Sequence, residues 1–539
     1  MKNEAENMEF EKLNVSLSQK EKEIEILLEK NKNLQLRNDY LEEQYQIFRA
    51  ILFGRKTEKR PFEPISVLQP SLFDEPTATS ETPSEIESEK TITVGNHQRK
   101  KPGRRPLPAD LPRKDSRIEL SEEEKHLSCG CVLVPIGEKV TEELDIIPAK
   151  IQVIRTIRVQ YVRKTPEGRD YCDTCDDVGA AGAMVLAPLP PKIIPQGIVT
   201  PGLLAHVATA KYVDALPLYR QEQQFQRLGL DINRGTLSNW MLLLGDACQI
   251  LIEFLFKEIL AGPVINMDET PVQVFREPGR SNTTKSYMWV CRGGTPEKPC
   301  IVFQYFPTRS GAVASKLLSN YKGFLQTDGY IGYETVGERE GIIHLGCWTH
   351  VRRKFVDVLK GTKGTNKASV AKTMVDYIGE LYGVEKRARA ENLTPEKIVE
   401  LRAVESKPIL DKIKKLLDEK GPTSPPKSLL GKAIYYALNQ WPRLEIFLQD
   451  GRLRLDNNLA ENSIRPFAIG RKNWMFMGSP RGANAGAGLY SLIETAKANG
   501  IEPYAYLRFI FAELPKASSD DEIRALLPQH LDRARLIVA

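Results

Sequence analysis

The sequence is poor in cysteine, carries little net charge and has no long hydrophobic run. Eight cysteines among 539 residues, behind the polar start MKNEAENMEF, do not suit a secreted disulfide framework. The most apolar run, MLLLGDACQILIEFLF, is interrupted by Asp246 and Glu253, whereas a membrane span needs about 20 mostly apolar residues. We therefore expect a cytoplasmic protein without a membrane segment, whose cysteines are thiols or metal ligands.

A net charge of +6 is too small to identify a partner, but the positive charge is concentrated in short segments. The chain is also too long for a single core, so several domains are expected. We divide the sequence into a coiled-coil helix (8–54), a disordered acidic linker (55–97), a basic DNA-contacting segment (98–117), a zinc-binding module (118–178), a helical segment (190–260), a catalytic core in two parts (261–359 and 446–512) separated by a helical insertion (360–445), and a C-terminal tail (513–539).

The first helix has apolar side chains at a spacing of 3.5 residues. Asn31 and Asn38 stand at a positions of this heptad, where asparagine costs stability but favours a defined register and a low oligomer number. The pattern predicts self-association through a coiled coil, and a helix packed onto its own protein is the alternative. With Leu13 at position d, Lys20 also falls at a d position, and the apolar seam passes through Leu13, Leu17, Ile24, Leu27, Leu34, Leu41, Tyr45, Phe48 and Leu52.

A basic segment follows a linker rich in proline, serine, threonine and glutamate, which buries too little apolar surface to order itself. The segment QRKKPGRRPLP has no acidic residue, and its prolines keep it extended. We expect it to contact DNA phosphates, and its arginines also suit a narrow minor groove. The basic side chains are Arg99, Lys100, Lys101, Arg104 and Arg105.

Two cysteine pairs separated by strand-like sequence predict one structural zinc ion. Cys129 and Cys131 form a C-x-C pair, and Cys172 and Cys175 form the more usual C-x-x-C pair. His126 is a candidate substitute ligand. The alternative is a β module whose four thiols no longer bind metal.

The next segments favour helices followed by a mixed α/β domain. A turn at Gly229 before a helix starting near Thr236 resembles a helix-turn-helix, although a plain helical hairpin has the same pattern. Three strand-like runs then precede a helix, a strand ending in TDGY and a second helix. This β-β-β-α-β-α order predicts an RNase H-like α/β core within a multidomain α+β protein.

Three acidic residues fall at points that such a core would bring together. Asp268 is expected at the end of the first strand, Asp328 at the end of the neighbouring fourth strand, and Glu461 on the helix after the insertion. Three carboxylates from separate elements can hold two Mg²⁺ ions, or Mn²⁺, for phosphodiester chemistry.

Neighbouring residues complete this predicted site. We expect Glu269 to face away from Asp268, because successive strand residues point to opposite faces. Asp456 is expected to cap the helix that carries Glu461, with Asn457 and Asn458 as further capping candidates. The side chains expected to hold DNA around the carboxylates are Arg465, Arg471, Lys472 and Trp474.

Four motifs in order, MDET, TDGY, CWTHVRRKF and LDNNLAENSIRPFAIGRKNWMF, resemble the catalytic core of the insertion sequence 66 family of bacterial DDE transposases. The resemblance covers nearly the whole chain and assigns the family's metal-binding triad to Asp268, Asp328 and Glu461. It places Cys347 and His350 of CWTH in a C-x-x-H pattern known from several transposase groups, with packing of the following helix as the alternative reading. The C-x-C pair of HLSCGC departs from the family's paired-cysteine form.

The resemblance implies a magnesium-dependent enzyme that binds double-stranded DNA at its element ends, frees a 3′-OH and joins it to target DNA. Family members typically come with two small companion proteins, and such an enzyme would act at the bacterial nucleoid. Two alternatives stay open: an RNase H-like nuclease or resolvase without strand transfer, and a zinc-containing DNA-binding regulator. The run GSPRGANAGAG lacks the order of an ATP-binding loop and is interpreted as a turn or close helix packing.

Overall fold

The computed structural model describes parts of residues 17–45, the short strands at 92–94 and 97–99, residues 151–162, 184–186, 188–195, 197–361 and 367–536. The chain divides into two compact units: Met1–Ile65 together with Pro190–Ala539, and Ser66–Leu189. Each unit is described by itself.

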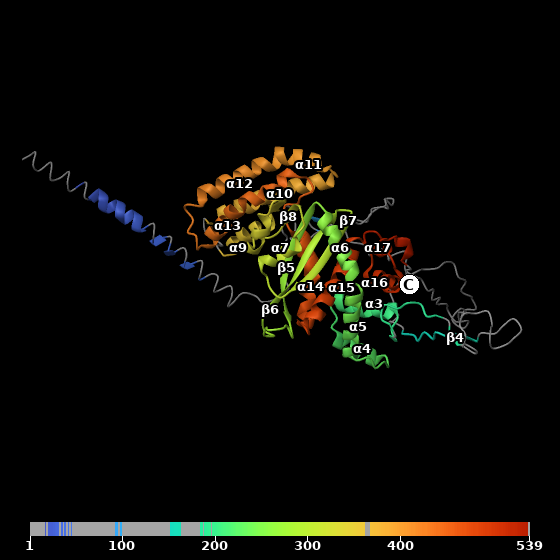
Figure 1. The fold of residues 1–539 in the computed structure, drawn as a ribbon. Helices are drawn as coiled ribbons and strands as arrows, with labels where there is room; N and C mark the ends of the chain where they lie inside the picture. The colour runs from blue at the N-terminus through green and yellow to red at the C-terminus, as the bar shows by residue number, and fades with distance from the viewer. Residues whose placement is uncertain are drawn as a thin grey trace, which may run out of the picture. The chain divides into compact units, whose positions relative to one another are not determined.

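A mixed sheet forms the centre of the larger unit (Figure 1). Its strands follow the order β7-β6-β5-β8-β9. The first three are antiparallel neighbours, whereas β8 and β9 run parallel to β5. The strands are β5 (Val264–Val274), β6 (Lys285–Thr295), β7 (Lys298–Phe306), β8 (Gly323–Gln326), β9 (Ile342–Leu345) and β10 (Phe476–Met477).

Strand β5 has two different neighbours along one side. Its amino-terminal residues, Val264 to Asn266, pair with β8, and its last two residues pair with β10. Among the described strands, none pairs with β5 on that side between these two points. Helix α14 (Asn458–Trp474) packs there, and the Asn457 side-chain amide donates to the free Met267 carbonyl at 2.7 Å.

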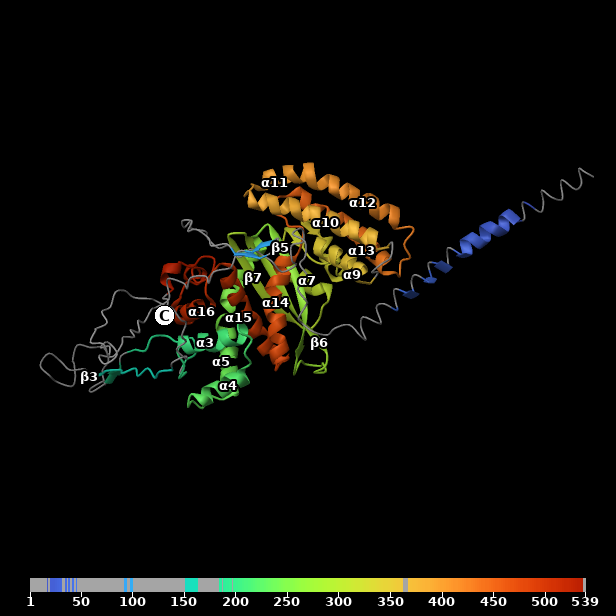
Figure 2. The ribbon, with the colours of Figure 1, turned by 180° about the vertical axis from the view of Figure 1, so that it is seen from behind.

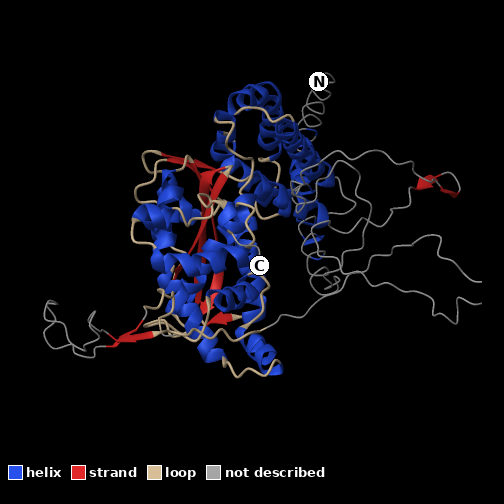
Figure 3. Cartoon of the chain, turned by 90° about the vertical axis from the view of Figure 1, so that its right-hand side faces the viewer, coloured by secondary structure: helices blue, strands red, loops and turns tan. Residues whose placement is uncertain are grey.

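Helices cover both faces of the sheet, which Figure 3 shows edge-on. Helix α14 crosses β5 and β6 on the face turned to the viewer in Figure 2. The helices of this first core are α3 (Pro201–Tyr212), α4 (Leu218–Arg227), α5 (Arg234–Ala247), α6 (Gln249–Ala261), α7 (Gly311–Leu317), α8 (Glu334–Gly337), α15 (Pro480–Ala498), α16 (Pro503–Glu513) and α17 (Asp520–Arg524).

The outer edge of β7 is closed by side chains of α15. The Thr495 hydroxyl accepts from the Ile301 N–H at 3.0 Å and donates to the Ile301 carbonyl at 2.9 Å. The Ser491 hydroxyl accepts from the Phe303 N–H at 2.8 Å. These bonds satisfy backbone groups that an edge strand otherwise leaves open.

The residues between β9 and α14 form a second hydrophobic core. The Arg402 guanidinium, 1% exposed, donates to both Glu385 oxygens and to the carbonyls of Asp450 and Leu453, which ties the insertion to the chain that leads into α14. The helices of this core are α9 (Trp348–Gly361), α10 (Lys367–Ala390), α11 (Pro395–Leu401), α12 (Lys407–Lys420) and α13 (Leu429–Leu444).

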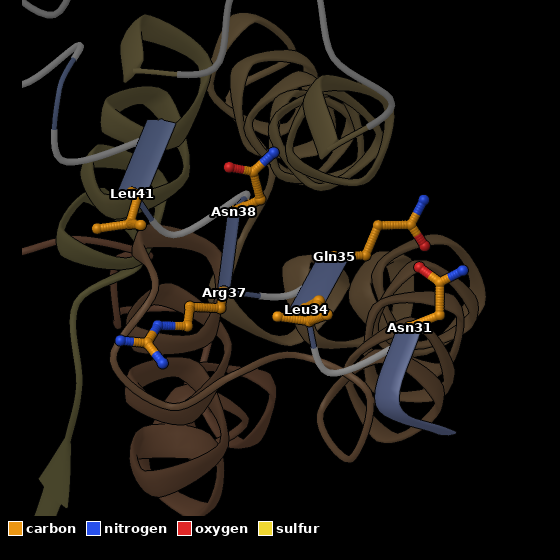
Figure 4. Close-up of a pocket in the computed structure, with 6 residues that line it drawn as sticks. All are labelled: Asn31, Leu34, Gln35, Arg37, Asn38 and Leu41. Carbon is orange, nitrogen blue, oxygen red and sulfur yellow. The ribbon is translucent and has the colours of Figure 1, made fainter. Parts of the chain in front are cut away.

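The described part of the N-terminal segment is helical and keeps its predicted seam exposed. Side chains at a and d positions, such as Leu34 at 59% and Leu41 at 56%, face solvent. A hollow on this helix is lined by Asn31, Leu34, Gln35, Arg37, Asn38 and Leu41, four of which are a or d residues (Figure 4).

In the smaller unit the structure describes two short hairpins and the irregular residues 151–159 and 188–189. Strand β1 (Ile92–Val94) pairs with β2 (His97–Arg99), and β3 (Gln160–Val162) pairs with β4 (Met184–Leu186). The four predicted zinc-binding cysteines, His126 and the basic residues from Lys100 to Arg105 lie outside the described residues.

The structure confirms the predicted mixed α/β class, with two differences in detail. Asp268 lies in the middle of β5 rather than at its end, because β6 continues to pair with β5 as far as Gln273. The residues after Glu513, expected as a tail, fold back so that Leu526 and Leu527 are buried in the first core.

Within the described residues, no single helix is long and apolar enough to cross a membrane. The pair α5 and α6, bent by 48°, passes that test by length and composition only. Both helices contribute buried side chains to the first core.

Candidate active site

The three predicted carboxylates come from three elements around the open stretch of β5. Asp268 is half-buried, and its Oδ1 accepts from the Glu269 N–H at 2.8 Å. Asp328 follows β8 by two residues, and its Oδ1 accepts from the Tyr330 N–H at 2.9 Å. Glu461 stands in the first turn of α14.

The charges of Glu461 and Asp328 act on Asp268. The pKa of Asp268 is raised well above its usual range, first by burial, then by the adjacent Glu269, and further by Glu461 and Asp328. Like charges near a half-buried carboxyl disfavour its ionised form, whereas a bound cation would favour it. The predicted triad therefore shares one electrostatic environment.

Amide side chains organise the backbone beneath this site. Asn266 donates to the Gln326 oxygen at 2.9 Å and to the Asn457 oxygen at 3.1 Å. These three buried amides join β5, β8 and the start of α14 without adding charge. The free backbone of β5 is thus satisfied by neutral groups, and the carboxylates are left for another purpose.

At the start of α14, one residue occupies the N-cap position and another accepts the hydrogen bond from the backbone. Asn457 stands at the N-cap of α14 but makes no side-chain capping bond. Asp456 instead accepts from the Asn458 N–H at 3.1 Å and from the Tyr382 hydroxyl at 2.8 Å. Both of its oxygens are therefore engaged, which separates Asp456 from the candidate metal ligands.

Glu269 faces away from Asp268 and holds an arginine beside the site. The buried Glu269 carboxylate accepts from Arg309 and from the Tyr333 hydroxyl. The Arg309 guanidinium stacks on the Tyr330 ring at 3.7 Å, and its Nη2 lies 4.0 Å from Asp328 Oδ2. Sequence reasoning missed Arg309, because a single arginine in a loop carries no pattern and only the strand order brings it next to Asp328.

Cys347 and His350 lie next to Glu461. The buried Cys347 sulfur accepts from the Asn457 N–H at 3.2 Å, and burial, with the nearby Asp456 charge, raises the pKa of its thiol to about 12. Burial lowers the pKa of His350, which Glu461 and Asp328 oppose. Ligand atoms of Cys347, His350 and Glu461 all lie within 4.8 Å of one another, a limit that the Asp268, Asp328 and Glu461 group of the described chain does not meet.

Basic side chains surround the carboxylates unevenly. Arg471 donates to the Thr270 hydroxyl at 3.2 Å, one strand repeat beyond Asp268, whereas Lys472 is exposed and Arg465 half-buried. The Trp474 ring packs edge-on against Phe467, with 5.4 Å between centroids, so it contributes to the core as well.

Sequence reasoning also missed two exposed cations, Arg353 and Lys354. Arg353 Nη2 lies 3.3 Å from Glu461 Oε2. Their signal was the basic run RRK that directly follows CWTH.

The chain belongs to the IS66 family of transposases. The family model described as "Transposase IS66 family" matches residues 196–485, and the "IS66 C-terminal element" matches 491–529. A "zinc-finger binding domain of transposase IS66" matches 128–162, and a "Transposase C of IS166 homeodomain" model matches 40–115. These matches confirm the predicted resemblance and give the chain a transposase role with DNA-binding parts.

Similar proteins occur in Sinorhizobium fredii (strain NBRC 101917 / NGR234). The uncharacterized protein y4qI is 33% identical over 460 residues, which cover 83% of this chain and 80% of y4qI. The uncharacterized protein y4jD is 33% identical over 437 residues, which cover 78% of this chain and 81% of y4jD.

Proposed function

We propose that this protein is a DDE transposase that binds the ends of its insertion sequence, cleaves one strand to free a 3′-OH and joins that 3′-OH to target DNA. The observation that carries the proposal is that Asp268 on β5, Asp328 after β8 and Glu461 on α14 come from three elements around the open stretch of β5, with the Glu461 and Asp328 charges raising the pKa of Asp268. The strand order, with three antiparallel strands followed by two parallel ones, supports an RNase H-like core for this chemistry.

The donor set suits hard divalent cations. The Oε1 atom of Glu461 is buried without a hydrogen bond, and the Asp268 carboxyl lies among other acids rather than beside a cation. Asp268, Asp328 and Glu461 would hold two Mg²⁺ ions, or Mn²⁺ in their place. When bound, such a pair supplies Lewis-acid stabilisation of the attacking and leaving oxygens of a phosphodiester.

The surrounding residues position DNA and the carboxylates. Arg309 is held by the buried Glu269 and by stacking on Tyr330, so its guanidinium keeps one orientation beside Asp328. Arg353 and Lys354 present exposed positive charge at the same site. These cations would contact phosphates on either side of the cleaved bond.

Other parts of the chain would supply binding and assembly. The exposed side chains of Arg220, Arg227 and Arg234 on α4 and α5 suit contact with element ends, next to a turn in which Gly229 adopts φ +80°. The segment from Arg99 to Arg105 would add phosphate contacts, and the exposed apolar seam of the N-terminal helix would pair with a second copy. The zinc site of Cys129, Cys131, Cys172 and Cys175 and the two companion proteins remain part of this proposal.

A strand-cleavage and joining assay on the element's own ends tests the proposal. In Mg²⁺, the wild-type chain should cleave and join DNA. The variants Asp268→Asn, Asp328→Asn and Glu461→Gln should lower the rates of both steps by more than about 100-fold, because removal of a residue that only hydrogen-bonds to a metal ligand already costs about 10–100-fold and loss of the ligand itself should cost more. End binding should persist in all three variants, because the basic residues carry it.

Asp521→Asn is the matched control, because its side chain is 96% exposed on α17 and touches none of the site. Cleavage without joining by the wild-type chain would favour a nuclease or resolvase. Full activity in all three triad variants would refute the proposal.

A further inference from the structure

The starts of α9 and α14 bring a thiol, an imidazole and a carboxylate together. Cys347 precedes α9 and His350 stands one turn later, whereas Glu461 lies in the first turn of α14. Their ligand atoms all lie within 4.8 Å of one another. The Cys347 side chain is buried, and the His350 and Glu461 side chains are 22% and 21% exposed.

Two polar atoms in this cluster lack partners. Glu461 Oε2 faces Arg353, but Oε1 is buried without a hydrogen bond. The nearest imidazole atom, His350 Nε2, lies 3.7 Å from that oxygen, which is too far for a hydrogen bond. His350 Nδ1 is also buried without a partner. Buried polar atoms without partners call for a bound water or ion.

Backbone contacts hold the two helix starts together. The Trp348 N–H donates to the Leu455 carbonyl at 2.9 Å, and the Trp348 indole fixes the start of α9 to the end of α13 by donating to the Leu444 carbonyl at 3.0 Å. The Asn457 N–H donates to the Cys347 sulfur at 3.2 Å. The ligands are therefore carried by elements whose relative position is fixed by several bonds, as a preorganised site requires.

We propose that Cys347, His350 and Glu461 form a separate site for one zinc-class dication, which shares Glu461 with the proposed magnesium site. Thiolate and imidazole ligands select Zn²⁺ or Co²⁺ over Mg²⁺, which prefers oxygen ligands alone. Bonds of about 2.0–2.3 Å in a tetrahedral site need ligand atoms roughly 3.3–3.8 Å apart, so a closing movement of about 1 Å is sufficient. Three protein ligands leave the fourth position open.

The role of this ion rests on the proposed function. Glu461 would be fixed from the Cys347 side while it faces Asp268 and Asp328 on the other. The bound ion would therefore act as a positioning device for one carboxylate of the triad and would not itself be needed for cleavage chemistry at Asp268.

Titration of the full-length, metal-stripped chain with Co²⁺ tests the site. Thiolate ligands give Co²⁺ a charge-transfer absorption in the near ultraviolet, which reports cysteine coordination directly. The wild-type chain should bind one Co²⁺ per chain more than Cys347→Ala and should show a correspondingly stronger absorption. Cysteines elsewhere in the chain are the same in both proteins, so the difference isolates this site.

Cys300→Ala is the matched control, because Cys300 is buried and lies beside Glu258, away from the cluster. It should bind as much Co²⁺ as the wild type. His350→Gln should also lose one Co²⁺, and it gives the same readout if Cys347→Ala does not fold. Equal Co²⁺ stoichiometry in the wild type, the foldable Cys347→Ala and His350→Gln would overturn the inference.

The two proposals fail in different ways. If Cys347→Ala loses one Co²⁺ while Asp268→Asn still cleaves and joins DNA, the zinc-class site stands and the transposase mechanism does not. If Asp268→Asn is inactive while all variants bind equal Co²⁺, the mechanism stands and the additional site does not.

Discussion

Two stretches of strand backbone in the same sheet, on β7 and on β5, have no neighbouring strand on one side and differ in the charged groups that surround them. The outer edge of β7 is closed by the Ser491 and Thr495 hydroxyls of α15, and the buried Glu494 between them on that helix is paired with Lys497 at 3.0 Å. The open stretch of β5 is closed by neutral amides, but carboxylates from three elements are gathered around it. The β7 edge is built for stability, whereas the β5 stretch keeps like charges close together at an energetic cost.

This difference in charge indicates that the candidate functional site is at β5 and not at β7. A purely structural edge has every polar group paired, as at β7. At β5 burial and the neighbouring acids raise the pKa of Asp268, which indicates that its charge is not compensated, and Glu461, whose Oε2 pairs with Arg353, keeps a buried Oε1 without a hydrogen bond. Perturbed groups of this kind cluster at functional sites.

The largest effect expected from the surroundings of β5 concerns Arg309. Arg309→Ala should lower strand cleavage by about 10–100-fold, the usual cost of removing an outer partner of a metal ligand. Arg309→Lys should restore only part of the activity, because lysine cannot keep both the Glu269 contact and the stacking on Tyr330. Cleavage rates of folded protein at equal end binding provide the measurement.

Arg481→Ala is the control for this arginine, since Arg481 pairs with Asp246 at a site where both side chains are 54% exposed. Equal cleavage by Arg309→Ala and the control would show that Arg309 does not act at the β5 site.

The next effect concerns the stability of the β7 edge. Thr495→Val removes the hydroxyl that accepts from the buried Ile301 N–H, so the free energy of unfolding should fall by about 1–3 kcal/mol. Cleavage per folded molecule should stay unchanged, because Thr495 lies outside the carboxylate site. Chemical denaturation measures the first quantity. A loss of cleavage without a loss of stability would contradict the contrast between the two edges.

The smallest effect concerns phosphate contacts near α14. Replacement of the exposed Lys472 by alanine should lower affinity for element ends modestly, and most at low salt, where counterion release contributes most. If Lys472 contacts one phosphate, the slope of log affinity against log salt should flatten by about 0.9. Lys516→Ala, on a residue paired with Glu513, should leave the slope as it is. An unchanged slope in both variants removes Lys472 from the DNA-binding surface.

The sequence was sufficient to predict the mixed α/β class, because strand-like and helical runs are local patterns. Strand-like runs predicted the mixed sheet. The family motifs assigned Asp268, Asp328 and Glu461, and this triad stays a prediction, supported by the effect of the Glu461 and Asp328 charges on the pKa of Asp268. The helix-turn-helix-like pair was also found close to its predicted turn, since α4 ends at Arg227 and α5 begins at Arg234.

Other features depended on contacts between distant residues. The length of β5 beyond Asp268 is set by pairing with β6 and β10, which no local pattern reports. Arg309 approaches Asp328 only through the buried Glu269, a residue predicted merely to face away. Trp474 stays a predicted DNA-contacting residue, and its ring also packs against Phe467, a contact that no local pattern reports.

The most direct test of uncompensated charge at β5 is thermal unfolding of the wild-type chain and Asp268→Asn across pH, with and without Mn²⁺. Because the folded-state pKa of Asp268 is raised, its contribution to stability is full below the unfolded-state value of about 3.9 and is lost as pH rises through the folded-state pKa. At neutral pH without metal, Asp268→Asn should therefore unfold at a higher temperature than the wild type, and Mn²⁺ should stabilise the wild type much more than the variant. A lower unfolding temperature for Asp268→Asn, with equal stabilisation of both proteins by Mn²⁺, would contradict the account.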